Sequence, residues 1–327
     1  MNDTQHAVLD GIEDGPASGP GIAADLGVSR AAVWKAVEAL RAEGFSIESD
    51  EEGYALAGVP EYGAGAVEYR LAADHGLGGA FDVEYHESIP STNARARELA
   101  REGAPRGDAS GAVVLADEQT GGRGRLDREW VSPSGGVWMS VLLRPDLPPA
   151  RAPLLTLAAA VATARAVGDV EPDCEVGLKW PNDVLAVDDA GEERKLAGIL
   201  TEMEGETDEV SWVVVGIGLN ANVDRGTLPK GATSLRERGG DVDRGRLVAT
   251  LLSAFDRLRS VPGEILPAWR ERSLTLGRRV RIETGGGEGI VGEAVSVEEP
   301  GALLVEGGNG TVRMHAGDCE HLRSDGE

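Results

Sequence analysis

The stretch that decides the fold reads GAVVLADEQTGGRGRLDREWVSPSGGVWMSVLLRP, from Gly111 to Pro145. Two apolar runs flank a loop in which glycines and arginines alternate, so the sequence predicts a strand, a loop and a second strand. The glycines permit positive φ angles and close backbone approach, and the arginines carry forked donors that suit carboxylate and phosphate oxygens. The loop therefore predicts a site for an anionic ligand. The competing interpretation is an exposed hairpin tip with solvated arginines.

The composition bounds the class of protein. The 327 residues are enough for two or three domains, and the apolar runs are too frequent for a disordered chain. There are 56 acidic and 32 basic residues, which gives a formal net charge of -24. This balance, with arginine far commoner than lysine, predicts a soluble protein of a high-salt, halophilic cytoplasm, where a carboxylate-rich surface keeps proteins hydrated and apart. Lysines that remain in such a chain are candidates for function.

Cysteine, histidine and apolar residues exclude several classes. Cys174 and Cys319 form no disulfide framework, which fits a reducing cytosol. The N-terminus lacks the basic start and apolar core of a signal peptide, and the longest apolar stretch, residues 152–167, is too short to span a bilayer. The five histidines show no paired ligand spacing. We therefore predict a cytoplasmic protein with no membrane association and no protein-bound metal.

The N-terminal residues 1–62 predict a winged helix-turn-helix domain. Residues 19–45 contain two short helical patterns, with Gly27 at the turn and Ser29 as the cap of the second helix, and residues 46–58 alternate like a wing hairpin. The unit resembles winged-helix domains that place the second helix in the DNA major groove, with Ser29, Arg30 and Lys35 toward the DNA. Residues 1–60 hold three basic and eleven acidic residues, which is unfavourable for phosphate attraction. A purely structural role therefore stays open beside DNA binding.

Residues 63–272 predict an α+β domain. The Gly58–Leu71 segment, which overlaps the start of this domain, is interpreted as a linker. A strand at 81–86 then leads to Ser91, the cap of a helix over 93–101. After a helix over 153–167, three apolar runs separated by acidic turns predict a mixed, largely antiparallel sheet. A final helix precedes residues 273–327, where short alternating strands and glycine turns predict a small β barrel.

Familiar nucleotide-binding motifs are missing, and five other segments take their place. The chain has neither a P-loop sequence nor a strand, G-x-G-x-x-G, helix unit. The five segments are STN (91–93), EQTGGRGR (118–125) with Trp130, KWPND (179–183), RKLAGIL (194–200) and GIGLN (216–220). In this order they closely resemble biotin protein ligases, in the three-domain form with an N-terminal winged helix and a C-terminal SH3-like domain. The chain differs from the usual pattern at Asp127, where a glycine is common.

The resemblance implies a two-step reaction. Biotin and ATP form biotinyl-adenylate, and biotin then passes to a lysine of a carboxylase's carrier domain. Mg²⁺ would arrive with the ATP phosphates and need few protein ligands. Operator DNA and a second copy of the chain, in a homodimer, are further partners that the family suggests.

The residue chemistry fits this reaction. Biotin carboxylate and the α-phosphate are both anions, so cations must offset their repulsion. The residues assigned to biotin and ATP are Ser91, Thr92, Asn93, Gln119, Gly122, Arg123, Gly124, Arg125, Trp130, Lys179, Asn182, Lys195, Gly198, Gly216 and Asn220. Hydroxyl and amide groups suit the ureido ring of biotin. Gly198 and Gly216, which are expected on strands, suit a wall that the ligand approaches closely. Trp130 packs on the loop, on the nucleotide, or in the core.

Three residues are assigned to catalysis. Lys195 is the main electrostatic catalyst, or else an exposed turn lysine. Asp183 positions or deprotonates the carrier lysine, because an amine attacks only when neutral, or it simply caps a turn. Arg125 holds the loop closed over the intermediate. The alternatives in function are a lipoate ligase, which shares the fold, and a transcription factor that senses biotin without catalysis.

Overall fold

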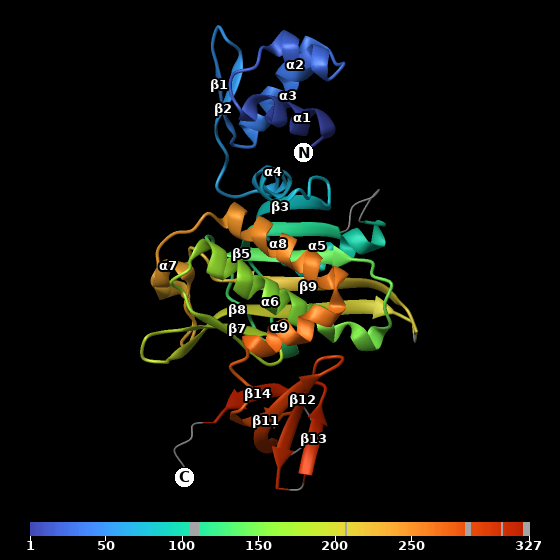
Figure 1. Cartoon of the computed structure of the whole chain (residues 1–327), viewed down its shortest axis with the longest axis vertical. Coiled ribbons are helices and arrows are strands. Elements are labelled where there is room, and N and C mark those ends of the chain that lie inside the picture. Colours follow the sequence, from blue (N-terminus) through green and yellow to red (C-terminus); the bar gives the residue numbers. More distant parts are fainter. Residues whose placement is uncertain (105–110, 207, 285–288, 309, 323–327) are drawn as a thin grey trace.

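The computed structural model describes residues 1–104, 111–206, 208–284, 289–308 and 310–322. Three units follow one another along its longest axis: a small helical unit, a seven-stranded sheet with helices on both faces, and a five-stranded sheet (Figure 1). The fold is α+β, as the sequence predicts. The last five residues of the predicted C-terminal domain lie outside the described residues.

The N-terminal unit is a helix-turn-helix followed by a hairpin. Its elements are α1 (Asp3–Glu13), α2 (Gly19–Asp25), α3 (Arg30–Ala42), β1 (Ser46–Ser49) and the antiparallel β2 (Tyr54–Gly58). Ser29 caps α3, because its side chain accepts a hydrogen bond from Ala32 N. Val33, Val37 and Leu40 recur at helical spacing and are fully buried against α1 and α2. The predicted helix-turn-helix and wing are confirmed.

The predicted linker is wrong in its second half. Residues 64–71 belong to α4 (Ala64–His75), which ends at Gly76 in the left-handed conformation. Glycines at 63 and 65 suggested a flexible segment, but Val67 and Leu71 are buried against the central unit. Tertiary packing of one apolar face outweighs the low helix propensity of glycine here.

The central sheet has the strand order β3-β4-β5-β9-β8-β7-β6. Only β3 and β4 are parallel; the other neighbours are antiparallel, as the meander pattern predicts. The strands are β3 (Phe81–Ile89), β4 (Gly111–Gln119), β5 (Val137–Leu143), β6 (Val176–Lys179), β7 (Asp183–Val187), β8 (Glu193–Gly205) and β9 (Val210–Leu219). The loop of residues 120–136, called the ligand loop below, joins β4 to β5, as predicted.

The two faces of the sheet have different roles. Alternate residues of β4, β5 and β9 pack against α6 (Pro153–Val170) and α8 (Arg244–Ser260) on one face. The intervening residues pack against α5 (Thr92–Arg101) on the other face. The short α5 leaves part of its face of the sheet uncovered, and the candidate site lies there.

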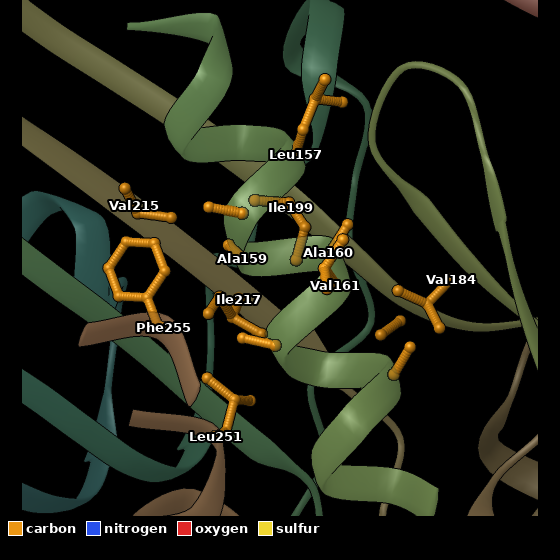
Figure 2. Packing of buried hydrophobic residues seen from close by; sticks show 14 of the residues in the cluster. Leu157, Ala159, Ala160, Val161, Val184, Ile199, Val215, Ile217, Leu251 and Phe255 are labelled. Carbon is orange, nitrogen blue, oxygen red and sulfur yellow. The ribbon is translucent and has the colours of Figure 1, made fainter. Parts of the chain in front are cut away.

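Helix α6 forms the centre of the core. Leu157 and Val161 belong to the same buried cluster as Ile199, Val215 and Ile217 of the sheet, and small alanines let the helix approach closely (Figure 2). Among the described residues, Pro149–Val170 alone has the length and composition of a membrane span, and 67% of that window is buried inside the protein. Each fully buried Leu or Ile contributes about 1.5–3 kcal/mol. Sequence reasoning did not identify α7 (Leu235–Arg238) or α9 (Ile265–Glu271), which follow polar or proline-containing stretches.

The C-terminal unit is an antiparallel sheet in the order β13-β12-β11-β10-β14. Its strands are β10 (Arg279–Glu283), β11 (Ile290–Glu298), β12 (Ala302–Gly307), β13 (Gly310–Met314) and β14 (Asp318–His321). It docks on the central unit through Trp180, whose indole Nε1 donates to Gly301 O at 3.0 Å. This contact joins the KWPND segment to the C-terminal unit.

Candidate active site

A cavity of about 640 Å³ opens on the α5 face of the central sheet. It brings together residues from all five segments, although they are up to 125 positions apart in sequence, from Ser91 to Gly216. The predicted site residues in its lining are Ser91, Thr92, Asn93, Gln119, Arg123, Gly124, Arg125, Trp130, Asn182, Asp183, Lys195, Gly198 and Gly216. Folding therefore collects these side chains around one space.

One end of the cavity is built from uncharged polar groups. Ser91 caps α5, which fixes the position of Thr92. The Thr92 backbone N–H and Oγ1 both donate to Gln119 Oε1, at 2.9 and 3.0 Å, and Gln119 Nε2 donates to Ser132 Oγ at 3.0 Å. These bonds fix the orientation of the Gln119 amide before any ligand arrives.

Ser140 supports this polar end and was not predicted. It lies fully buried on β5, and its Oγ lies 2.8 Å from Thr92 Oγ1 and 2.6 Å from Asn93 Oδ1. Since a hydroxyl has one proton, Ser140 donates to one of the two acceptors at a time. A serine inside the otherwise apolar run VWMSVLL was the signal in the sequence.

Several charged residues of the lining were also missed, among them Glu202 and Arg97. Glu202 accepts from Asn93 Nδ2 at 2.7 Å and forms a short ion pair with Arg97. Asn93 is thereby held between Ser140 and Glu202. The sequence did not indicate a role for Glu202, because this residue lies in the polar stretch TEMEGE, which is typical of the solvent-exposed end of a strand.

Glycines make one wall of the cavity flat enough for aromatic packing. A Cβ at Gly216 would come within 2.2 Å of Asn93 Oδ1, and a Cβ at Gly218 within 2.6 Å of Trp130 Nε1. Trp130 therefore crosses the wall at Gly198 and Gly218, and its partly buried ring lines the cavity while it also packs against the small apolar cluster of Ala116, Trp138 and Val223. Its buried Nε1 has no hydrogen-bond partner among the described residues. That leaves a donor for a ligand oxygen.

Lys195 and Asp183 face each other across adjacent strands. The distance from Lys195 Nζ to Asp183 Oδ1 is 2.7 Å, and the two atoms form an ion pair although the angles at Oδ1 do not make a hydrogen bond. Lys195 Nζ also lies 5.0 Å from the centre of the Trp130 ring. The lysine backbone is held at both ends, since Lys195 N donates to Gly231 O and Thr233 N donates to Lys195 O. Lys195 is thus a fixed cavity residue rather than an exposed turn lysine.

The ligand loop is held at its tip by the C-terminal unit. Arg125 donates to Asn182 Oδ1 at 3.2 Å and to Gly317 O at 3.1 Å, and Arg128 forms an ion pair with Asp318. Leu126 and Asp127 have φ angles of 55° and 56°. A positive φ explains why glycine is common where this chain has Asp127, and aspartate is one of the side chains that tolerate it.

Charge in the cavity is balanced, unlike charge in the whole chain. Five basic residues (Arg97, Arg123, Arg125, Arg128 and Lys195) and five acidic ones (Asp127, Glu129, Asp183, Glu202 and Asp318) line it. Against a net charge of -24, this is a local enrichment in cations that suits an anionic ligand. In the described part of the chain, no group of three or more His, Cys, Asp or Glu side chains could hold a metal ion.

Three predicted residues lie outside the lining of the cavity. Gly122 packs against Trp130 O, and buried Asn220 donates to Thr233 O at 2.9 Å, which holds the segment that covers Lys195. Lys179 does not line the cavity; burial and the charge of Lys179 lower the pKa of His321 in the C-terminal unit. Gly122 and Asn220 support the site from behind.

The residues predicted to face DNA lie on α3. Ser29 is its cap, and Arg30 and Lys35 are exposed. Trp34, between them in sequence, is also exposed. The helix therefore presents two cations and one aromatic side chain to solvent.

Comparisons with known proteins agree with this arrangement. The chain matches the models of the biotin/lipoate A/B protein ligase family over residues 85–220, of the biotin protein ligase C-terminal domain over 275–322, and of an HTH domain over 12–55. It is 37% identical to the bifunctional ligase/repressor BirA of Bacillus subtilis (strain 168), covering 93% of each chain. It is 38% identical to the biotin--[acetyl-CoA-carboxylase] ligase of Mycobacterium tuberculosis, covering 71% of this chain and 86% of that relative.

A solved structure supports the same assignment. The biotin protein ligase of Aquifex aeolicus in complex with biotin and ATP matches with a TM-score of 0.58 and 26% identity, over 74% of this chain and 99% of that one. The similarity to ligases extends over nearly the whole chain, and the helix-turn-helix, the ligase sheet and the C-terminal sheet occur in the same order. The chain belongs to the biotin protein ligase family.

Proposed function

We propose that the protein is an ATP-dependent ligase that makes biotinyl-adenylate and transfers biotin to a lysine of a biotin carboxyl carrier domain. One observation supports this most: the Lys195 ammonium, 2.7 Å from Asp183 Oδ1, opens into the same cavity as the preorganised Thr92–Gln119 pair. A polar end for a neutral ring and a cationic end for an anionic group are what biotin and ATP together require.

In the first step, a carboxylate oxygen of biotin attacks the α-phosphorus of ATP, and pyrophosphate leaves. Thr92, Asn93 and Gln119 hold the ureido ring through their hydroxyl and amide groups. Lys195 and Arg125 offset the repulsion between the two anions and stabilise the charge that builds on phosphorus. Trp130 lies where the nucleotide base can stack on it, with its free Nε1 toward a ligand oxygen.

In the second step, a neutral lysine amine of the carrier attacks the acyl carbon, and AMP leaves. Asp183 lies on the rim of the cavity with 22% of its side chain exposed, so an incoming amine can reach it. Its carboxylate accepts the proton that the amine must lose. Lys195 neutralises Asp183 in the resting state and is free to follow the phosphate when ATP binds.

The proposal extends to the C-terminal sheet, the metal ion and the cellular environment. The five-stranded C-terminal sheet is an SH3-like barrel, Mg²⁺ enters on the ATP phosphates, and the ligase works in a salt-rich cytosol, as a monomer or a homodimer. Mg²⁺ usually keeps several waters and binds through substrate phosphates, so it needs few protein ligands.

The direct test is incubation of the protein with biotin, Mg-ATP and a purified carrier domain, with the mass of the carrier as readout. We expect one added biotin on one lysine, together with pyrophosphate release. Lipoate in place of biotin separates the lipoate-ligase alternative. Biotin binding without pyrophosphate release would contradict the ligase and favour a non-catalytic sensor.

A second function, repression of transcription, rests on the N-terminal unit. The helix-turn-helix presents Arg30 and Lys35 on α3, and relatives that match over the whole chain are named ligase/repressor. The test is binding to the DNA upstream of the protein's own gene, measured with and without biotin and ATP. Affinity that is unchanged when Arg30 and Lys35 are both replaced by alanine would exclude α3 as the reading helix.

A further inference from the structure

The base of the ligand loop is closed by Asp117, a residue outside the five signature segments. Asp117 lies on β4 and accepts from Ser134 Oγ in a short hydrogen bond and from Gly135 N at 3.4 Å. Ser134 and Gly135 are at the far end of the loop, so this one carboxylate ties the end of the loop to its beginning. Gln119 N, donating to Ser132 O at 2.9 Å, forms a second tie just above it.

Asp117 is in turn held by Arg244, the first residue of α8. Arg244 Nη1 donates to Asp117 Oδ1 at 2.6 Å and to Gly136 O at 3.3 Å. The guanidinium is mostly buried, with 12% of the side chain exposed, and lies 4.2 Å from the centre of the Tyr62 ring. This environment strengthens the contact, because water competes less with a buried ion pair. Hydrogen bonds from Arg244 and Ser134 accordingly lower the pKa of Asp117 against the opposing effect of burial.

The same guanidinium also holds the segment that leads from the N-terminal unit. Arg244 Nε and Nη2 donate to the two carboxylate oxygens of Glu61, at 3.0 and 2.8 Å, and Gly245 N donates to Glu61 O at 2.9 Å. Glu61 is thus the point where the chain from the winged helix joins the central unit. One cation stands between a carboxylate of that junction and a carboxylate of the loop base.

We propose that Asp117 and Arg244 are positioning residues for the ligase reaction, and that Glu61, at the junction that follows the N-terminal unit, helps to hold the ligand loop in position through its shared contact with Arg244. This inference rests on the proposed function. Without Arg244, two carboxylates face each other and Asp117 loses its neutralising partner. The loop base then opens, and Arg123, Arg125 and Trp130 no longer meet the ligand in a fixed geometry. None of the three positioning residues lines the cavity.

The kinetic test uses Asp117→Ala, Asp117→Asn and Arg244→Met in the full-length protein, with adenylate formation as readout. We expect Asp117→Ala and Arg244→Met to raise KM for biotin and ATP about tenfold, with much smaller changes in kcat, since a displaced loop weakens binding more than chemistry at Lys195. Asp117→Asn keeps an acceptor oxygen and should recover most of the loss. Asp169→Ala is the matched control, because Asp169 of α6 pairs with Arg246, which lies on the same helix as Arg244 but makes no contact with Asp117.

Loop position is read independently of activity by trypsin cleavage after Arg123, Arg125 and Arg128, followed by mass spectrometry. Cleavage in Asp117→Ala and Arg244→Met should be faster than in the wild type and in Asp169→Ala, at equal thermal stability. Glu61→Gln should increase cleavage as well, and its effect should fail to add to that of Asp117→Ala, because both act through Arg244.

Two results would overturn the proposal: wild-type KM values and cleavage rates in Asp117→Ala, or strictly additive effects of Glu61→Gln and Asp117→Ala. A wild-type protein that makes no adenylate would instead refute the proposed function. Faster cleavage in the variants would then still show that Asp117 and Arg244 hold the base of the ligand loop.

Discussion

At the scale of the residue, Lys195 carries the proposed mechanism most directly. It is a compact point charge that can follow phosphate oxygens as they shift, which a planar guanidinium does less well. Lys195→Ala should slow adenylate formation by a hundredfold or more, about 3 kcal/mol of transition-state stabilisation. Lys195→Arg should restore only part of the rate.

The control for Lys195 lies in the second step. Transfer from pre-made biotinyl-adenylate should be affected less, because pyrophosphate has left and the carboxylate is already neutral in the anhydride. Single-turnover kinetics measures the two steps separately. Equal losses in both would indicate a binding or folding defect, and a first step at the wild-type rate would remove Lys195 from the mechanism.

Ser140 provides a second prediction at this scale. Ser140→Ala leaves Asn93 and Thr92 without a buried donor, which costs about 1–3 kcal/mol for an unsatisfied group. We expect KM for biotin to rise while kcat changes little, because the polar end of the cavity is affected and the cationic end is not. Thr163→Ala is the matched control, since Thr163 is an equally buried hydroxyl that bonds only within α6. Equal effects of the two substitutions on KM would contradict this role.

At the scale of the element, the tip of the ligand loop depends on β14. Asp318 pairs with Arg128 and lies 3.9 Å from Arg125, so it holds two loop arginines at the edge of the cavity. Asp318→Asn should let the loop open more often and release adenylate sooner, seen as biotin on unrelated proteins in the same tube. Glu320 lies on the same strand as Asp318 and forms a more exposed ion pair with Arg281 of β10. Glu320→Gln should therefore not increase the release of adenylate. Off-target labelling at the wild-type level in Asp318→Asn would contradict a holding role.

The docking of the C-terminal sheet should depend on pH through His321. Its Nε2 lies 3.0 Å from Thr275 Oγ1, which accepts from Trp180 N, and its Nδ1 lies 3.2 Å from a carboxylate oxygen of Glu193. Burial and the charge of Lys179 lower the pKa of His321 below its ordinary value of 6.5. The folded state therefore binds fewer protons than the unfolded state in this range.

The sign of the pH effect follows from this difference. The contribution of His321 to the free energy of unfolding is complete above its ordinary pKa and is lost as the pH falls below that value toward the folded pKa. Thermal unfolding from pH 8 to 5 should show this loss in the wild type and a flatter profile in His321→Asn. The exposed His315, replaced by glutamine, should leave the profile unchanged. Identical slopes for His321→Asn and the wild type would contradict the assignment.

At the scale of the whole molecule, chemistry and the N-terminal unit should be separable at Glu61. All five signature segments lie between Ser91 and Asn220, and the contacts of Arg244 reach back only to Glu61 and Tyr62. A chain that starts at Glu61 should keep its ligase rate on the carrier domain, whereas one that starts at Gly63 should show the raised KM values of Arg244→Met. A large loss of adenylate formation in the longer chain, with the core still folded, would contradict this separation.

Local signals in the sequence were sufficient for the elements that carry strong periodicity or caps. Ser29 and Ser91 predicted the starts of α3 and α5, and alternating apolar runs predicted the antiparallel part of the sheet. The helix α4 was missed because Gly63 and Gly65 have low helix propensity. Burial of Val67 and Leu71 against the central unit stabilises the helix. Local propensity is a weak prior where tertiary packing decides.

For the site, the sequence by itself determined which residue types are available: loop arginines and glycines, a rare lysine, and the STN and Gln119 polar groups. Thirteen of the residues that the sequence assigns to the site line one cavity. The tertiary structure alone decided how they are held. Ser140, Glu202 and Asp318 touch the site only because β5, β8 and β14 bring them there, and the ion pair of Lys195 with Asp183 exists only across the β7–β8 ladder. The physical reason is that residue chemistry is local, whereas burial, pairing and charge neutralisation depend on neighbours that are distant in the chain.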